Sequence, residues 1–183
     1  SVAVGAETVR IAPGTTAFTP LDFVSYPWSH SLVMLVIWGV VFGAVTRPRG
    51  ASGTALFLIA ALVVSHWILD FLTHRPDMPL YPGGPRYGLG LWNSVGATLI
   101  VELAMFAAGV AVYTRSTRAL VARGKWGFFV FVLFLLLVYG ANIIGGPPPS
   151  VTAVWIAGLL GGVLLIVWSW WFDRHRSPVS TTG

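Results

Sequence analysis

The chain contains the sequence WGFFVFVLFLLLVYGANII at residues 126–144, which includes no charged side chain. A helix of about 20 apolar residues is long enough to cross the hydrocarbon core of a membrane. Backbone amides in that core must be hydrogen-bonded within the segment itself, so a helix is the form we expect there. This stretch therefore predicts a transmembrane helix.

The rest of the chain repeats this pattern. Only 9% of its residues are charged and 56% are hydrophobic, whereas a soluble domain carries about 25% charged residues. The fold class we predict is therefore all-α: a polytopic helical membrane protein with about five transmembrane helices in a single domain over residues 28–172. The other four helices are expected at residues 28–46, 51–72, 91–113 and 151–172.

Lys and Arg are divided unequally between the two sides of this topology. One side carries eight of them: Arg47, Arg49, Arg115, Arg118, Arg123, Lys125, Arg174 and Arg176. The other side carries three: Arg10, Arg75 and Arg86. Because cytoplasmic loops are enriched in Lys and Arg, we expect residues 1–27 to be extracytoplasmic and residues 173–183 to form a cytoplasmic tail. Basic residues scattered between apolar segments also argue against a nucleic-acid partner.

Three residues near the outer ends of the first two predicted helices are potential metal ligands. His66 and Asp70 are four residues apart and share one helical face, and His30 begins the neighbouring helix at the same depth. Imidazole nitrogen and carboxylate oxygen both bind Zn²⁺. The chain has no cysteine, so we predict a divalent metal, Zn²⁺ in the first place, bound by His30, His66 and Asp70. The alternative is that these side chains only hydrogen-bond to other helices or to water.

Three further polar residues lie close to this group or deeper in the membrane. His74 follows His66 on the same face, and Asp77 lies in the next loop; we predict that one of the two accepts a proton in catalysis. For Asp77, which precedes a Pro-containing turn, the alternative is a structural role in that turn. Glu102 falls near the middle of the third predicted helix, where hydrogen bonding to another helix is favoured over proton transfer.

The segment Trp28-Ser29-His30-Ser31-Leu32, followed by His66 and Asp70, resembles the YdjM-like family of bacterial membrane-bound metal-dependent hydrolases, formerly classed as a domain of unknown function. Residues 73–80 and 88–94 are similar to an uncharacterised multi-pass branch of that family. The resemblance implies a multi-pass protein of the bacterial cytoplasmic (inner) membrane. It also implies a His and Asp pattern distantly similar to that of zinc-dependent phospholipase C. Members usually carry a Gly-His pair and a further Asp nearer the N-terminus, and no residues before Ser29 match these.

Two functions remain open at this point. The first is a membrane-embedded metal-dependent hydrolase that acts on a lipid-linked or amphiphilic ester or phosphoester at the outer membrane interface, with membrane lipid as its partner. The second is a non-catalytic structural or accessory subunit of a larger membrane protein complex or homo-oligomer. Abundant aromatic and small residues would serve the second function equally well, and a bound metal would separate the two.

Overall fold

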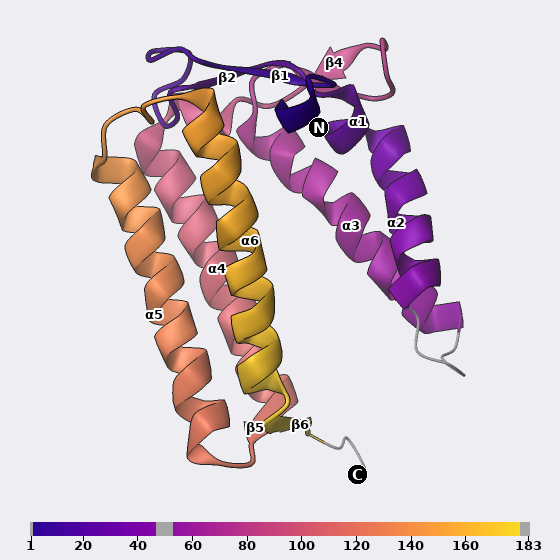
Figure 1. The fold of residues 1–183 in the computed structure, drawn as a ribbon, viewed down its shortest axis with the longest axis vertical. Coiled ribbons are helices and arrows are strands. Elements are labelled where there is room, and N and C mark those ends of the chain that lie inside the picture. The colour runs from indigo at the N-terminus through magenta and orange to yellow at the C-terminus, as the bar shows by residue number, and fades with distance from the viewer. Residues whose placement is uncertain (1, 47–52, 180–183) are drawn as a thin grey trace. The chain divides into compact units, whose positions relative to one another are not determined.

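The computed structural model of the chain describes residues 2–46 and 53–179. It is mostly helical (Figure 1) and divides into two compact units, Ser1–Thr98 and Leu99–Gly183. The predicted break at residues 47–50, the predicted start of the second helix at Ala51, residue 1 and the last residues of the predicted tail, 180–183, lie outside the described residues.

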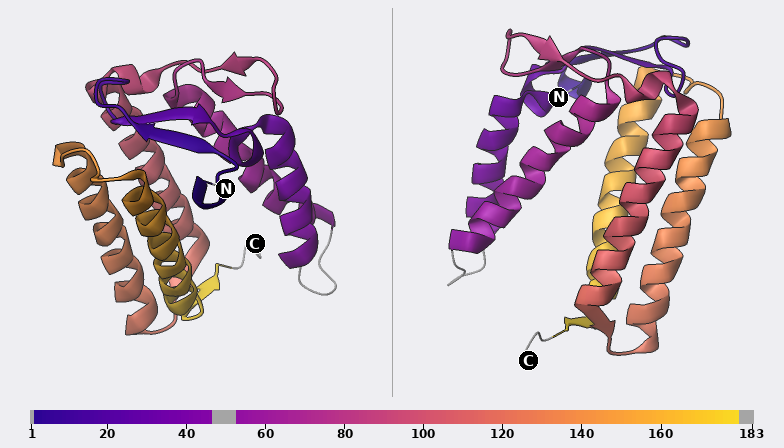
Figure 2. Two further views of the ribbon diagram at one scale, coloured as in Figure 1. Left: turned by 45° about the horizontal axis from the view of Figure 1, so that its top comes forward. Right: turned by 180° about the vertical axis from the view of Figure 1, so that it is seen from behind.

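Two helices that lie side by side form the frame of the first unit (Figures 1 and 2): α2 (Leu32–Thr46) and α3 (Gly53–Thr73). Gly39 and Gly43 of α2 lie against Ala60 and Leu56 of α3, and a Cβ atom on Gly39 would be 3.0 Å from the Ala60 carbonyl oxygen. Small residues four apart allow such close packing between membrane helices. The α2–α3 contact therefore depends on these two glycines.

Replacing Gly39 with leucine is expected to lower the free energy of unfolding in detergent by about 1–3 kcal/mol, because the larger side chain forces α2 away from α3. Gly158→Leu in α6 is the matched control, since a Cβ atom at Gly158 would have no described atom within 4 Å apart from its chain neighbours and the adjacent backbone of α6. Thermal unfolding of the two variants measures the difference. Equal stability of Gly39→Leu and wild type would contradict this packing.

One end of the α2–α3 pair, called the capped end below, is covered by short elements (Figure 2). They are α1 (Pro27–His30), the strand pair β1 (Thr8–Ile11) and β2 (Leu21–Ser25), the strand pair β3 (Met78–Pro79) and β4 (Arg86–Tyr87), and the 3₁₀ helices η1 (Val2–Val4) and η2 (Leu91–Asn93). Both strand pairs are antiparallel. Met78 of β3 is fully buried. These elements position the site described below.

Three long helices make up most of the second unit: α4 (Val95–Ser116), which begins in the first unit, α5 (Ala122–Ile144) and α6 (Val151–Asp173). Phe128 and Phe131 of α5 pack on Phe172 of α6; their ring centroids lie 5.6 and 5.3 Å from that of Phe172. The strand β5 (Thr117–Ala119) follows α4, and β6 (Arg176–Pro178) follows α6. The two strands pair antiparallel and so connect the C-terminal ends of α4 and α6. The unit is thus held by aromatic side chains at one end of its helices.

Four helices, α3 to α6, are long and apolar enough to cross a membrane, and α2 is an apolar helix of 15 residues within the described part. Their apolar side chains are largely exposed, as in Leu62, Ile100 and Leu160, which is the arrangement expected where lipid is the solvent. The prediction of a helical multi-pass protein is therefore confirmed. The all-α prediction omitted the three short strand pairs, which lie outside the apolar segments on which it rested.

Candidate metal centre

Three potential ligands converge at the capped end of the first unit. His30 is the last residue of α1, and His66 and Asp70 lie in the last two turns of α3. Asp70 Oδ2 is 3.2 Å from His66 Nε2 and 3.7 Å from His30 Nε2. One ligand atom from each residue lies within 4.8 Å of the other two. The structure thus brings together the three residues predicted as ligands.

The local sequence explains this convergence. His66 and Asp70 are one helical turn apart and share a face of α3. Between α1 and α2 the chain breaks at Ser31, whose backbone is extended (ψ 142°). The Ser31 hydroxyl oxygen accepts a hydrogen bond from the Met34 N–H at 3.4 Å, as a helix cap does. The break lets His30 leave the axis of α2 and reach α3.

Glu7 and Ser29 hold the other side of the His30 ring. Glu7 is buried, and its Oε1 accepts hydrogen bonds from the backbone N–H groups of Trp28 and Ser29 at 2.9 and 2.7 Å. Its Oε2 accepts a hydrogen bond from the Ser29 hydroxyl at 2.6 Å. The Ser29 oxygen in turn lies 2.6 Å from His30 Nδ1. These contacts fix the orientation of His30.

They also determine which ring nitrogen of His30 carries the proton. The Ser29 hydroxyl donates its one proton to the Glu7 carboxylate, so its oxygen accepts from Nδ1–H of His30. Burial, followed by the nearby His66, lowers the pKa of His30 to about 4, so the ring is neutral at pH 7. Its Nε2 lone pair therefore faces His66 and Asp70, which is the arrangement of a metal-binding imidazole.

The donor set fits a divalent metal of the zinc type. Two imidazole nitrogens and one carboxylate oxygen are a common protein ligand set of catalytic zinc, which keeps a further position for water or substrate. Tetrahedral coordination with bonds of about 2.0–2.1 Å separates ligand atoms by about 3.3 Å, close to the two separations from Asp70. The His66 side chain is 50% exposed, compared with 17% for Asp70, so the group is open on the His66 side.

His74 and Asp77 form a second cluster beside this group and do not join it. Asp77 Oδ1 accepts hydrogen bonds from the Tyr26 hydroxyl at 2.6 Å and from His74 Nδ1 at 3.0 Å, and Oδ2 accepts one from Arg75 Nε at 3.1 Å. Burial opposes the charge of Asp77, but the hydrogen bonds from His74, Tyr26 and Arg75 outweigh it and lower its pKa. Asp77 is therefore an ionised carboxylate whose two oxygens are both engaged.

Tyr26 connects the two clusters. Its ring packs edge-on against His30 with centroids 5.1 Å apart, while its hydroxyl binds Asp77. The His74 ring is buried against Phe23 and Trp92, with centroids 4.9 and 4.4 Å away. The cluster of His74 and Asp77 thus supports one side of the candidate metal centre.

Replacing Asp77 with asparagine is expected to lower the free energy of unfolding by about 2–4 kcal/mol. The neutral amide leaves the buried Tyr26 and His74 donors without an anionic acceptor and removes one of the two carboxylates that pair with Arg75. The control is Asp173→Asn, which alters a more exposed carboxylate bonded to Tyr113. Thermal unfolding in detergent compares the two. A variant of Asp77 that is as stable as wild type but inactive would instead support the proton-acceptor role predicted from the sequence.

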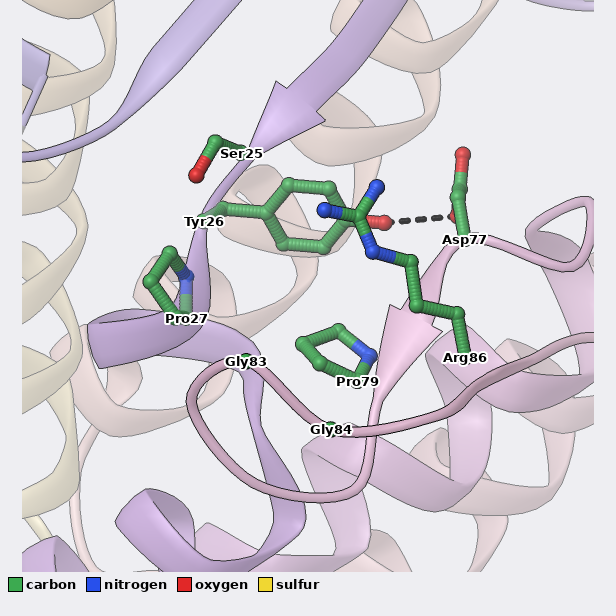
Figure 3. A pocket seen from close by; sticks show the side chains of 8 residues that line it. All are labelled: Ser25, Tyr26, Pro27, Asp77, Pro79, Gly83, Gly84 and Arg86. Carbon is green, nitrogen blue, oxygen red and sulfur yellow. Dashed lines mark hydrogen bonds between the residues drawn. The ribbon is translucent and has the colours of Figure 1, made fainter.

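A pocket of about 260 Å³ lies beside Tyr26, between the end of β2 and the β3–β4 turn (Figure 3). The turn has Pro82 and Gly83 at its centre, with Gly83 at φ +77° and a hydrogen bond of 2.8 Å from the Gly84 N–H to the Tyr81 carbonyl. A glycine with positive φ after proline is typical of a type II turn. The lining residues are Ser25, Tyr26, Pro27, Asp77, Pro79, Gly83, Gly84 and Arg86.

Two other ionisable residues, Glu102 and His175, lie in the second unit. The Glu102 carboxylate accepts a hydrogen bond of 2.7 Å from the Tyr139 hydroxyl, which joins α4 to α5 as the structural alternative predicted. His175 Nδ1 lies 2.9 Å from the Trp171 carbonyl oxygen. Neither residue belongs to the His30, His66 and Asp70 group.

Sequence reasoning missed Glu7, Ser29 and Tyr26, and it counted Arg86 only as a loop charge. A contact between Ser29 and His30 could have been predicted, because the two residues are adjacent in the sequence. Glu7 carried no such signal, since it is brought to α1 by the pairing of β1 with β2.

Fold and site together define a class: a multi-pass membrane protein with a cluster of two histidines and an aspartate at one end of its helices. The chain belongs to the YdjM inner membrane protein family, whose family model matches residues 20–149. No curated protein and no solved structure gives a significant match. The predicted family and the predicted location in the inner membrane are thereby confirmed.

Proposed function

We propose that the protein is a metal-dependent hydrolase, with a divalent metal, Zn²⁺ in the first place, bound by His30, His66 and Asp70. The observation that carries the proposal is the approach of His30 Nε2, His66 Nε2 and Asp70 Oδ2 to within 4.8 Å of one another. If His66 and Asp70 only hydrogen-bonded to each other within α3, no third potential metal ligand would have to lie beside them. The support of His30 by Ser29 and Glu7, which leaves Nε2 unprotonated, favours a ligand role.

A divalent metal bound there would supply a Lewis acid and an activated water nucleophile near neutral pH. The chain's own residues hold and orient the site. Glu7 and Ser29 fix the His30 ring, and the Asp70 carboxylate contributes the one negative charge among the ligands. His74 and Asp77 were expected to accept a proton; the three hydrogen bonds to Asp77 favour a positioning role, in which the pair holds Tyr26 against His30.

The position of the site along α3 suggests an amphiphilic substrate. His66 and Asp70 precede the end of α3 at Thr73 by about 10 and 5 Å of helix rise. Apolar residues close in sequence to the three ligands are exposed, including Trp28, Ile68 and Leu69. A substrate with its tail in the lipid and its ester or phosphoester at the surface would reach the ligands without leaving the membrane. We therefore propose a lipid-linked or amphiphilic ester or phosphoester.

Hydrolysis of short-chain phospholipids and carboxylic esters in detergent micelles tests the activity. We expect product release that is lost with a chelator, restored by Zn²⁺, absent in His66→Ala and retained in His175→Ala. Product release that continues in His66→Ala, or that ignores the chelator, would overturn the proposal.

We further infer that α2 crosses the membrane with α3 to α6, and that the capped end faces outward. The surplus of Lys and Arg at the opposite loop ends supports this orientation. Because the chain has no cysteine, single cysteines at Tyr87 and Arg118 can be labelled with a membrane-impermeant maleimide in intact spheroplasts. We expect only the cysteine at position 87 to react; labelling of position 118 alone would reverse the orientation.

A further inference from the structure

Arg86 differs from the other two arginines of the capped end. Arg10 binds Asp22, and Arg75 bridges Asp22 and Asp77. The two carboxylates thus balance the two guanidinium groups. Arg86 makes no ion pair with any described carboxylate, and its one hydrogen bond within the described residues is a long one, 3.3 Å, to the Val24 carbonyl oxygen. Most of its donors are therefore available to a ligand.

The Arg86 side chain faces the pocket beside Tyr26. It runs from β4 and passes in front of the Tyr26 hydroxyl in Figure 3, and its charge acts on that hydroxyl. Asp77 also lines the pocket, but its charge is balanced by Arg75 and its oxygens are occupied. The pocket therefore presents one uncompensated positive charge, on a group whose planar fork matches phosphate oxygens.

We propose that this pocket binds a phosphate group of the substrate, with Arg86 as the residue that recognises it. The inference rests on the proposed function and narrows its substrate class to phosphate-bearing amphiphiles, as opposed to uncharged carboxylic esters. The Tyr26 ring forms a wall of the pocket and also touches His30, so a group bound there lies one aromatic ring away from the candidate metal centre.

The volume of the pocket is suited to a lipid headgroup. At about 260 Å³ it is somewhat smaller than the ~300–1,000 Å³ sites that enclose drug-sized ligands. Gly83 and Gly84 of the β3–β4 turn line one side of it and add no side chains to the cavity (Figure 3). A phosphate group fits beside Arg86, whereas an acyl tail would stay outside in the lipid.

Calorimetric titration of the detergent-purified protein in chelator-treated, metal-free buffer tests the inference. The probes are inorganic phosphate, dihexanoyl phosphatidic acid and, as the phosphate-free match, dihexanoylglycerol. We expect at least one phosphate-bearing probe to bind and dihexanoylglycerol not to bind. Binding of phosphatidic acid without binding of inorganic phosphate would identify a lipid headgroup as the ligand. Binding of both phosphate-bearing probes would identify the phosphate group itself.

Arg86→Gln is expected to weaken this binding by at least about 10-fold, the loss of a charge-assisted contact, and Arg86→Lys by less. Arg10→Gln is the matched control and should bind as wild type does. Equal affinity in Arg86→Gln, binding of dihexanoylglycerol, or no binding of either phosphate probe would overturn the proposal. His66→Ala should retain phosphate binding, so a failure of the metal proposal and a failure of this one are distinguishable.

Discussion

Replacing Asp70 with alanine is expected to weaken Zn²⁺ binding by more than about 100-fold, since loss of a supporting partner of a ligand alone costs 10- to 100-fold and Asp70 is the one anionic member of the set. It is also the member that approaches both histidines, at 3.2 and 3.7 Å. Competition with a chromophoric chelator measures the affinity in detergent.

Asp173→Ala is the matched control, because it removes a carboxylate near the end of another helix, where it accepts a hydrogen bond from Tyr113. That variant should keep the wild-type affinity. If Asp70→Ala still bound Zn²⁺ as tightly as wild type, the three residues would be a hydrogen-bonded group between helices and no more.

Replacing Glu7 with glutamine is expected to weaken Zn²⁺ binding by about 10- to 100-fold, although Glu7 does not touch the proposed metal position. The Glu7 carboxylate accepts the Ser29 proton, which makes the Ser29 oxygen an acceptor for Nδ1–H of His30. A glutamine amide can reverse this direction and allow the proton to move to Nε2. Glu7 is thus a positioning residue, and competition titration again reads its effect.

A double-mutant cycle separates this role from simple destabilisation. Ser29→Ala removes the same link, so the losses in Zn²⁺ affinity of Glu7→Gln and Ser29→Ala should not add in the double variant. Glu7→Asp should restore part of the affinity. Additive losses, or an unchanged affinity in Glu7→Gln, would mean that Glu7 supports only the start of α1 through the N–H groups of Trp28 and Ser29.

The helices were predictable because lipid requires long apolar runs, and α3, α5 and α6 correspond to such runs. The first and last residues of the helices were less predictable. The predicted helix 91–113 begins at Val95 after the turn η2 and continues to Ser116, and the predicted helix 28–46 is interrupted at Ser31. Both shifts arise at serines or turns whose hydrogen bonds are local and carry no hydropathy signal.

The approach of His66 to Asp70 was predictable from their spacing, since one helical turn separates them. His74 was expected on the same face, but α3 ends at Thr73, and the His74 ring is turned into the aromatic side chains of Phe23 and Trp92. That outcome depends on β2 and on the loop before α4, which are distant in sequence. The same holds for Glu7 and Arg86, which strand pairing brings to the site.

Elemental analysis of the detergent-purified protein shows whether the chain binds a metal ion. Wild type, His66→Ala and the control His175→Ala should be purified with a tag that contains no histidine, then dialysed against trace Zn²⁺. We expect about one equivalent of zinc in wild type and in His175→Ala, and loss of the metal in a folded His66→Ala. Wild-type protein that contains no metal and takes up none would contradict it, and would favour a structural subunit of a membrane assembly.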